Sequence, residues 1–261
     1  MLFADVLSVG IDSTSGRREF TFAALDRDLK LIALAEAELD EVAAFLIGQD
    51  SVVVAVNSPS HLNAGIVRKR LEALSLTPHA IRGAEIREAE FELHARGIQV
   101  SSTPGTEALC PAWMQLGFDL HRRLAKLKFK PFPDEAAPHQ WMETHPHAAF
   151  CALLGSVPLP KPTLEGRLQR GLALFERGLG IRDPMIFLEE ITRHRLLHGF
   201  LPTDLLLSPE QLDALVAAYT AFLGATKPAE ITRLGNRQEG FVTLPAPQLK
   251  EKYQSFVGQA T

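Results

Sequence analysis

The five residues Val52–Val56, four of them valine, constrain the fold of this chain more than any other segment. Consecutive β-branched residues favour a strand, and a run without polar alternation is typical of an interior strand that is covered on both faces. Such strands occur in sheets with helices packed on each side. No apolar run approaches the roughly 18 residues of a membrane-spanning helix, so we expect no membrane segment.

The elements around this strand give the order of a mixed sheet. Leu2–Ile11 has the pattern of a buried strand, and Phe20–Leu25 with Leu29–Ala35 predicts a hairpin. The apolar residues between Leu39 and Ile47 recur at helical spacing, and Gly48 ends that helix. The predicted order of elements in the N-terminal part is therefore strand, strand, strand, helix and strand.

The remaining chain is mainly helical, with short strands between the helices. The spacing predicts helices over 64–97, 107–128 and 164–178, a short strand at 140–143, and a helix that begins at Pro146. Segments 231–234 and 241–244 resemble a closing hairpin. We expect a single α/β domain over 1–261, with helical insertions near 60–130 and 147–200.

One late helix has the clearest start signal in the sequence. Ser208 and Gln211 form a capping box, and Pro209 fits the first turn, where its missing N–H is not needed. Asp213 shares a helix face with small residues such as Ala217 and Gly224, which would let the helix approach a sheet closely. Asp213 should then point towards that sheet.

Composition excludes several classes of protein. Hydrophobic residues make up 46% and charged residues 22%, which is ordinary for a globular protein and excludes a disordered or fibrous chain. The two cysteines, Cys110 and Cys151, are too few for a disulfide framework in 261 residues. We expect a cytoplasmic protein. The sequence carries no indication of the oligomeric state.

Basic residues gather in one stretch although the net charge is −4. Arg122, Arg123 and Lys126 lie close together, with Asp119 as the nearby acid. This stretch fits either a solvated helix face that ends in cationic residues or a contact with a nucleic-acid backbone.

Three acids stand where α/β sheets usually place a site, at the carboxyl ends of strands or on the helix that covers that end. Asp12 ends the first strand, Glu143 ends a later one, and Asp213 lies near the start of the late helix. Carboxylates of this kind bind Mg²⁺ or Mn²⁺ and support phosphodiester hydrolysis. Each acid also has a structural interpretation, as a turn cap, an ion-pair partner or a helix N-terminal charge.

A family resemblance rests on motifs that occur in order along the chain. They are Val9-Gly10-Ile11-Asp12, Val54-Ala55-Val56-Asn57-Ser58-Pro59, Glu143-Thr144-His145-Pro146, Lys161-Pro162-Thr163-Leu164-Glu165-Gly166-Arg167 and Leu212-Asp213-Ala214-Leu215. In these motifs the chain resembles the domain of unknown function family 429, whose members are predicted ribonuclease H-like nucleases. The resemblance runs from about residue 5 to residue 245.

The resemblance implies a five-stranded ribonuclease H-like mixed sheet and a magnesium-dependent nuclease. Asp12, Glu143 and Asp213 would be metal ligands, with Lys161 and Arg167 as basic residues near the site. Many relatives have Asp where this chain has Asn57, so one negative charge is missing. Three carboxylates would then face two divalent ions, and metal binding should weaken.

The resemblance therefore predicts a poor nuclease, a one-metal enzyme, or a module that only binds nucleic acid. We expect Asp12, Asn57, Glu143 and Asp213 to form the catalytic group. Arg122, Arg123 and Lys126 would join Lys161 and Arg167 in binding the substrate.

Three alternatives remain at this point. A non-catalytic binding or regulatory module would keep the acids as structural groups. Gly10–Gly16 also resembles the first phosphate loop of actin-like sugar kinases, although 261 residues are too few for their two domains. His139, His145, His147 and Cys151 crowd together, which would suit zinc, but their spacing matches no known zinc motif.

Overall fold

The computed structural model describes residues 6–14, 18–74, 85–203 and 206–255. Its strands are β1 (Leu7–Asp12), β2 (Phe20–Leu25), β3 (Leu31–Ala37), β4 (Val52–Asn57), β5 (Lys130–Pro131), β6 (His139–Thr144), β7 (Thr232–Asn236) and β8 (Gly240–Leu244). Its α-helices are α1 (Leu39–Ile47), α2 (Ile66–Leu74), α3 (Glu88–Ala95), α4 (Ala112–Lys126), α5 (Pro146–Leu154), α6 (Leu164–Phe175), α7 (Pro184–His198) and α8 (Pro209–Thr226). Short 3₁₀ turns lie at η1 (Glu107–Leu109) and η3 (Pro228–Glu230).

The described strands form one mixed sheet in the order β3-β2-β1-β4-β6-β8-β7, with β5 added beside β6. β1, β4, β6 and β8 run parallel to one another, whereas β2, β3 and β7 join through antiparallel pairs. The α/β class is confirmed, but the sheet has eight strands in place of the expected five. The sequence predicted the β7–β8 hairpin without showing that its second strand continues the sheet next to β6.

The predicted N-terminal elements are present, with shifted boundaries. The first strand begins at Leu7, and residues 2–5 of its expected range lie outside the described part. Helix α1 covers Leu39–Ile47 and ends at Gly48 as predicted. The long helical stretch expected at 64–97 contains α2 and α3, with residues 75–84 outside the described part.

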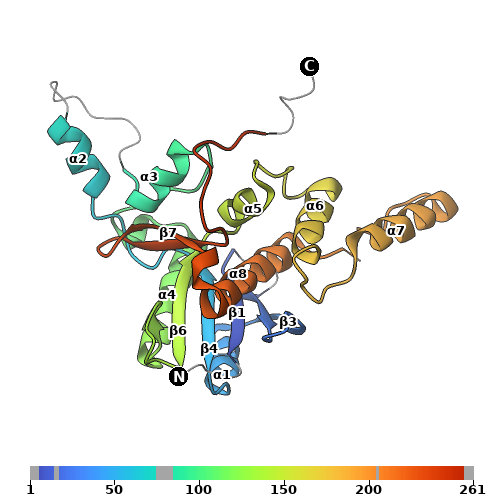
Figure 1. The fold of residues 1–261 in the computed structure, drawn as a ribbon, viewed down its shortest axis with the longest axis horizontal. Helices are drawn as coiled ribbons and strands as arrows, with labels where there is room; N and C mark the ends of the chain where they lie inside the picture. Colours follow the sequence, from blue (N-terminus) through green and yellow to red (C-terminus); the bar gives the residue numbers. More distant parts are fainter. Residues whose placement is uncertain (1–5, 15–17, 75–84, 204–205, 256–261) are drawn as a thin grey trace.

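Helices cover both faces of the sheet. Val9, Ile11 and Val56 pack in a core with residues of α1 and α4. The other face packs against α8, where Val53 and Ala55 contact one side of that helix. In Figure 1, α8 crosses the middle of the molecule beside β1 and β4. The continuous valine run is therefore explained, because β4 is buried on both sides.

A glycine allows α8 to lie unusually close to β1. A Cβ atom at Gly10 would lie 2.0 Å from the carbonyl oxygen of Ala214 and 2.1 Å from the nitrogen of Ala218. No side chain fits there without moving the helix. The Ser208–Gln211 capping box fixes the start of α8, as the sequence predicted. Together these features hold Asp213, in the early part of α8, beside the carboxyl end of β1.

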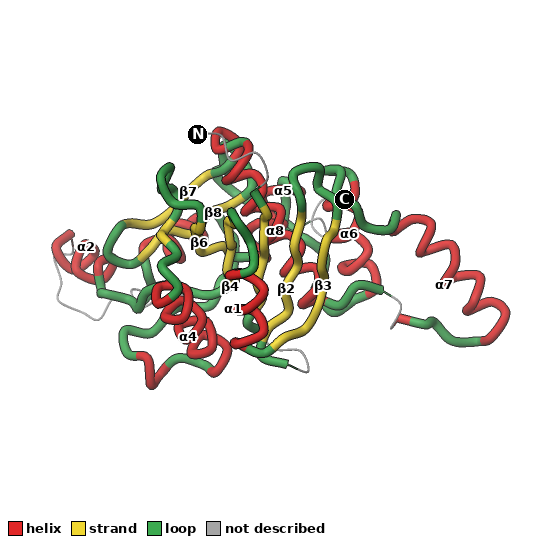
Figure 2. Tube along the Cα trace, turned by 90° about the horizontal axis from the view of Figure 1, so that it is seen from below, coloured by secondary structure: helices red, strands yellow, loops and turns green. Residues whose placement is uncertain are grey.

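Helix α7 stands apart from this layered body. Figures 1 and 2 both show it projecting from one end of the molecule, beyond α6. Among the described residues, no helix is long and apolar enough to cross a membrane.

Candidate active site at the carboxyl ends of the parallel strands

Asp12 and Asn57 end two adjacent parallel strands and point to the same face of the sheet. The two residues are in register across the β1–β4 pair. The Asn57 side-chain amide donates to Asp12 Oδ1 at 2.5 Å, and Thr14 Oγ1 donates to Asp12 Oδ2 at 2.5 Å. Ser13 Oγ also donates to the backbone carbonyl of Asn57 at 2.9 Å. Asp12 is fully buried, so these donors replace the water that an exposed carboxylate would bind.

Asp213 approaches the same strand ends from α8. Its carboxylate accepts a hydrogen bond from Lys161 Nζ at 2.5 Å. The Asp213 side chain is 8% exposed and the Lys161 side chain 36% exposed, so water reaches the pair from the lysine side. The charge of Asp12 also acts on Asp213. The structure therefore brings Asp12, Asn57, Asp213 and Lys161 into one group.

Burial changes the acidity of both aspartates. The pKa of Asp213 is raised to about 7, mainly by burial and also by the Asp12 charge, while Lys161 opposes the rise. Burial also raises the pKa of Asp12, against the hydrogen bonds from Thr14 and Asn57. Asp213 is thus poised between its protonated and ionised forms near neutral pH, as an acid–base group often is.

A cavity of about 240 Å³ opens beside this group. Its lining includes Thr14, Asn57, Trp113, His147, Lys161 and Asp213. Arg170 also lines it, with its guanidinium Nη1 bound to the carbonyls of Leu159 and Gly166 at 2.8 Å each. Carboxylate, amide and cationic groups thus converge on one space at the strand ends.

The histidines that follow β6 are neutral structural groups. His145 caps α5 by accepting the Ala148 N–H at 3.3 Å, and burial lowers its pKa to about 3. Burial raises the pKa of the Cys151 thiol to about 12. Within the described ranges, no group of three His, Cys, Asp or Glu side chains is placed to hold a metal ion. The zinc alternative therefore finds no support here.

Glu143 lies on the opposite face of the sheet from Asp12. It is in register with Val56, which is in register with Ile11, and both of these residues face α1 and α4. Successive residues of a strand point to opposite faces, so Glu143 points away from the face that carries Asp12 and Asn57. The described contacts do not join Glu143 to Asp12 or Asp213, although Glu143 and Asn57 line one small cavity, and a cation shared by the three acids stays a prediction.

Glu143 instead belongs to a buried ion network. Its carboxylate accepts hydrogen bonds from Arg87 Nη2 at 2.5 Å and from Arg87 Nη1 at 3.0 Å. The Ser60 N–H also donates to it at 2.8 Å. Arg87 bridges onward to Glu90 at 2.8 Å. Although burial favours a neutral guanidine, Glu143 and Glu90 raise the pKa of Arg87, so the network stays charged.

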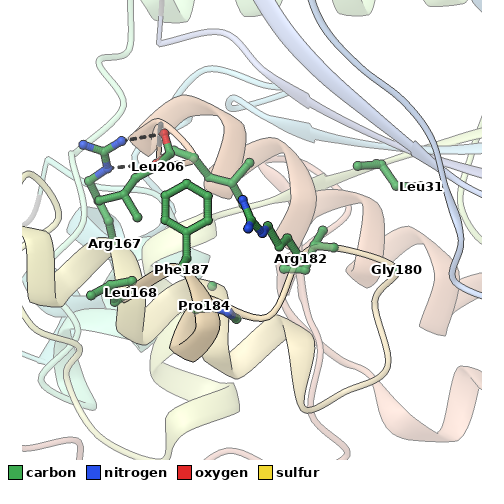
Figure 3. A pocket seen from close by; sticks show the side chains of 11 residues that line it. Leu31, Arg167, Leu168, Gly180, Arg182, Pro184, Phe187 and Leu206 are labelled. Carbon is green, nitrogen blue, oxygen red and sulfur yellow. Dashed lines mark hydrogen bonds between the residues drawn. The ribbon is translucent and has the colours of Figure 1, made fainter. Parts of the chain in front are cut away.

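Lys161 and Arg167 come from the same sequence motif but do different things. Lys161 reaches the aspartates, whereas Arg167 donates to the backbone carbonyls of Thr203, Leu206 and Leu207. Arg167 lines a separate, largely apolar cavity of about 270 Å³ between α6 and α7, as Figure 3 shows. These hydrogen bonds hold the segment that precedes α8 against α6.

The basic residues of α4 lie on the helix that covers the other face of the sheet. Arg122 pairs with Glu107 and Asp119, and Arg123 pairs with Asp40. Lys126 is exposed. None of these three lines the cavity beside Asp12. Their proposed contact with nucleic acid stays a prediction about a separate surface.

Several residues of the site were not found from the sequence. Thr14 had a local signal, because a hydroxyl two residues after a strand-ending aspartate can reach its carboxylate. Arg170 and Trp113 had none, since they come from helices whose distance from β1 is set by packing. Arg87 gave no sign of pairing with Glu143, 56 residues away.

A family described as "Protein of unknown function (DUF429)" matches residues 10–228. The chain belongs to this family. No curated protein and no solved structure matches the chain. The match includes the residues placed around the cavity, from Asp12 to Asp213.

Proposed function

We propose that this DUF429 chain is a nuclease that hydrolyses phosphodiester bonds with the help of one Mg²⁺ or Mn²⁺ ion. One observation carries the proposal. Two buried aspartates with raised pKa values share a single lysine beside an open cavity. Buried carboxylates without full compensation are costly, and they persist where a cation or a reaction needs them.

The donor set fits one hard cation. Asp12, Asp213 and the amide oxygen of Asn57 are oxygen ligands of the kind that Mg²⁺ prefers, and Mg²⁺ is commonly held by one or two carboxylates with water and substrate phosphate. The charges also balance, because two carboxylates match one divalent ion. Because Glu143 points to the opposite face of the sheet, Asp12, Asn57 and Asp213 do not supply enough carboxylates for a second ion. Such a cation supplies activation of water and charge stabilisation at the leaving oxygen.

The chain's own residues have distinct parts in this proposal. In the cation-free protein burial raises the pKa of Asp213 to about 7, and a bound cation would favour its ionised form. Lys161 neutralises Asp213 in the cation-free protein, and it lines the cavity where a phosphate would sit. With Asp213 holding a cation, the Lys161 ammonium would be available to bind that phosphate. Arg170 adds a buried positive charge to the same wall.

The architecture supports a ribonuclease H-like assignment. Strands β3-β2-β1-β4-β6 form a mixed sheet in which β2 is antiparallel to its neighbours and β1, β4 and β6 run parallel to one another, and the resemblance implies a mixed sheet. In that fold an acid at the end of the first strand and an acid on the last helix belong to the site. Asp12 and Asp213 occupy these two places.

The test is cleavage of labelled single-stranded and duplex DNA and RNA with Mg²⁺ or Mn²⁺. Asp12→Asn and Asp213→Asn should each lower the cleavage rate about 100-fold or more, as expected when a group that stabilises the transition state is lost. Glu143→Gln is the matched control, a buried acid at the end of the neighbouring strand, and it should keep most of the activity when assayed well below its unfolding temperature. Equal loss in all three variants, or cleavage that survives Asp12→Asn, would contradict the proposal.

A second candidate is a non-catalytic nucleic-acid-binding module. The Lys161–Asp213 bridge and the Asn57–Asp12 hydrogen bond favour it, because they give each acid a hydrogen-bond partner without a cation. Calorimetry separates the two functions. Nucleic-acid binding that is unaffected by Mn²⁺, with no heat from Mn²⁺ alone, would favour the binding module.

A further inference from the structure

Helix α7 exposes four large apolar side chains. Leu196 is 82% exposed and Leu197 72%, and near the other end Met185 and Ile186 are each 53% exposed. Both ribbon views show this helix extending away from the rest of the molecule (Figures 1 and 2). Large apolar side chains grouped on one exposed element mark an interaction surface more often than chance.

The exposed residues share one face of α7. Ile191 and Pro184 are buried and mark the side that packs on the body. At 100° per residue, the positions opposite Ile191 are 185, 186, 189, 193, 196 and 197. Glu189 and Arg193 lie in the middle of this outer face, with side chains 70% and 72% exposed. An apolar pair stands at each end of it.

This face is complementary to itself in one orientation. Position 191 is the midpoint between 185 and 197, between 186 and 196, and between 189 and 193. If two copies pack with α7 antiparallel about a two-fold axis near that position, the apolar pair at one end meets the apolar pair at the other end of the partner. Each Glu189 then faces an Arg193 of the second copy. A parallel arrangement would place like charges together, which is unfavourable.

We infer that α7 is a homodimerisation surface, in which a second copy of this chain packs antiparallel on the outer face of the helix. The surface is isologous, since each contact occurs twice about the axis. Because 15 residues span about 22 Å, the contact is smaller than a standard interface. The dimer should therefore be reversible and depend on concentration.

The Glu189–Arg193 contact within one helix does not account for these features. The two side chains are 2.8 Å apart in the isolated chain, as is common for residues four apart on an exposed helix. Such a pair needs no flanking leucines. The paired apolar ends and their symmetric spacing are what a second copy would use.

Sedimentation of the full chain tests the inference. Protein at about 1 to 200 μM should show a monomer–dimer equilibrium. Replacing both Leu196 and Leu197 by Glu should weaken the association about tenfold or more, because two apolar contacts at each end are lost. Leu109→Glu is the matched control, since Leu109 is 74% exposed on η1, away from α7, and its replacement should change nothing.

A charge exchange identifies the orientation. Glu189→Arg and Arg193→Glu should each weaken self-association, since each variant presents like charges to its own copy. Mixed together, the two variants should form a heterodimer, because each Arg then faces a Glu. A wild-type chain that stays monomeric at about 200 μM would overturn the inference. So would a dimer that neither the leucine nor the charge variants affect.

Discussion

Two clusters of buried acids lie at the carboxyl end of the sheet, one on each face, and they are built differently. On one face, Glu143 receives two hydrogen bonds from Arg87 and one from the Ser60 N–H. On the other face, Asp12 and Asp213 share Lys161, and burial raises the pKa of both acids.

The difference separates a structural cluster from a functional one. The Glu143 carboxylate is matched by a guanidinium whose geometry fits it, so the ions stabilise one another and the strand end. Burial raises the pKa of both aspartates more than their partners lower it, which reduces stability at neutral pH. A protein keeps such a cost where the site needs free negative charge.

The largest effect should follow from breaking the compensated cluster. Arg87→Ala leaves Glu143 and Glu90 buried without their partner, which should lower the free energy of unfolding by about 3 to 5 kcal/mol. Urea unfolding followed by circular dichroism measures the change. Arg68→Ala removes an exposed arginine that also pairs with two acids, and it should have little effect. Equal losses in both variants would show that burial of the Arg87 network contributes nothing.

At the aspartates, by contrast, removing a charge should raise the free energy of unfolding. The pKa of Asp213 is about 7 in the folded chain against its ordinary value of 3.8, so its effect on stability is most favourable below pH 3.8 and is lost as the pH rises towards 7. Asp213→Asn removes this penalty. It should stabilise the protein by about 2 kcal/mol at pH 8 and make no difference near pH 4. Thermal unfolding across this pH range is the measurement, and a less stable variant at pH 8 would be the contrary result.

A third substitution tests whether position 57 belongs to the cation site. Asn57→Asp adds a carboxylate beside Asp12 and removes the amide donor, so the cation-free protein should become less stable. Mn²⁺ affinity should rise about tenfold, which corresponds to about 1.4 kcal/mol. Titration calorimetry measures this affinity. If neither cation affinity nor cleavage increases, position 57 does not belong to the site.

The smallest expected effect concerns Thr14. Thr14→Val keeps the shape but removes the hydrogen bond to Asp12 Oδ2, so the pKa of Asp12 should rise further. The loss of stability at neutral pH should be about 1 kcal/mol. Thr220→Val is a comparison on the scaffold, where the hydroxyl donates to the Val216 carbonyl and no ion is involved. The Thr14 variant should show the stronger dependence on pH, and identical pH profiles would argue against the expected shift.

Local chemistry predicted much of the fold. Ser208 and Gln211 fixed the start of α8, and the valine run predicted a strand that is covered on both faces. The place of β8 beside β6 was not predictable, because the pairing of strands 99 residues apart depends on the packing of the helices between them.

The candidate site was also predictable only in part, because local sequence places some of its residues and strand register places the others. Asp12 and Asn57 end adjacent strands, and a helix rich in small residues carries Asp213 to them. The position of Glu143 depends on which face its strand turns towards, and a shift of one residue reverses that choice. The sequence showed that Glu143 ends a strand but not its register with Val56.

Crystals of the protein soaked in Mn²⁺ test the central claim most directly. We expect one anomalous peak about 2.2 Å from carboxylate oxygens of Asp12 and Asp213, close to Asn57, and no peak at Glu143. A peak at Glu143, or no peak between the two aspartates in well-soaked crystals, would contradict the account.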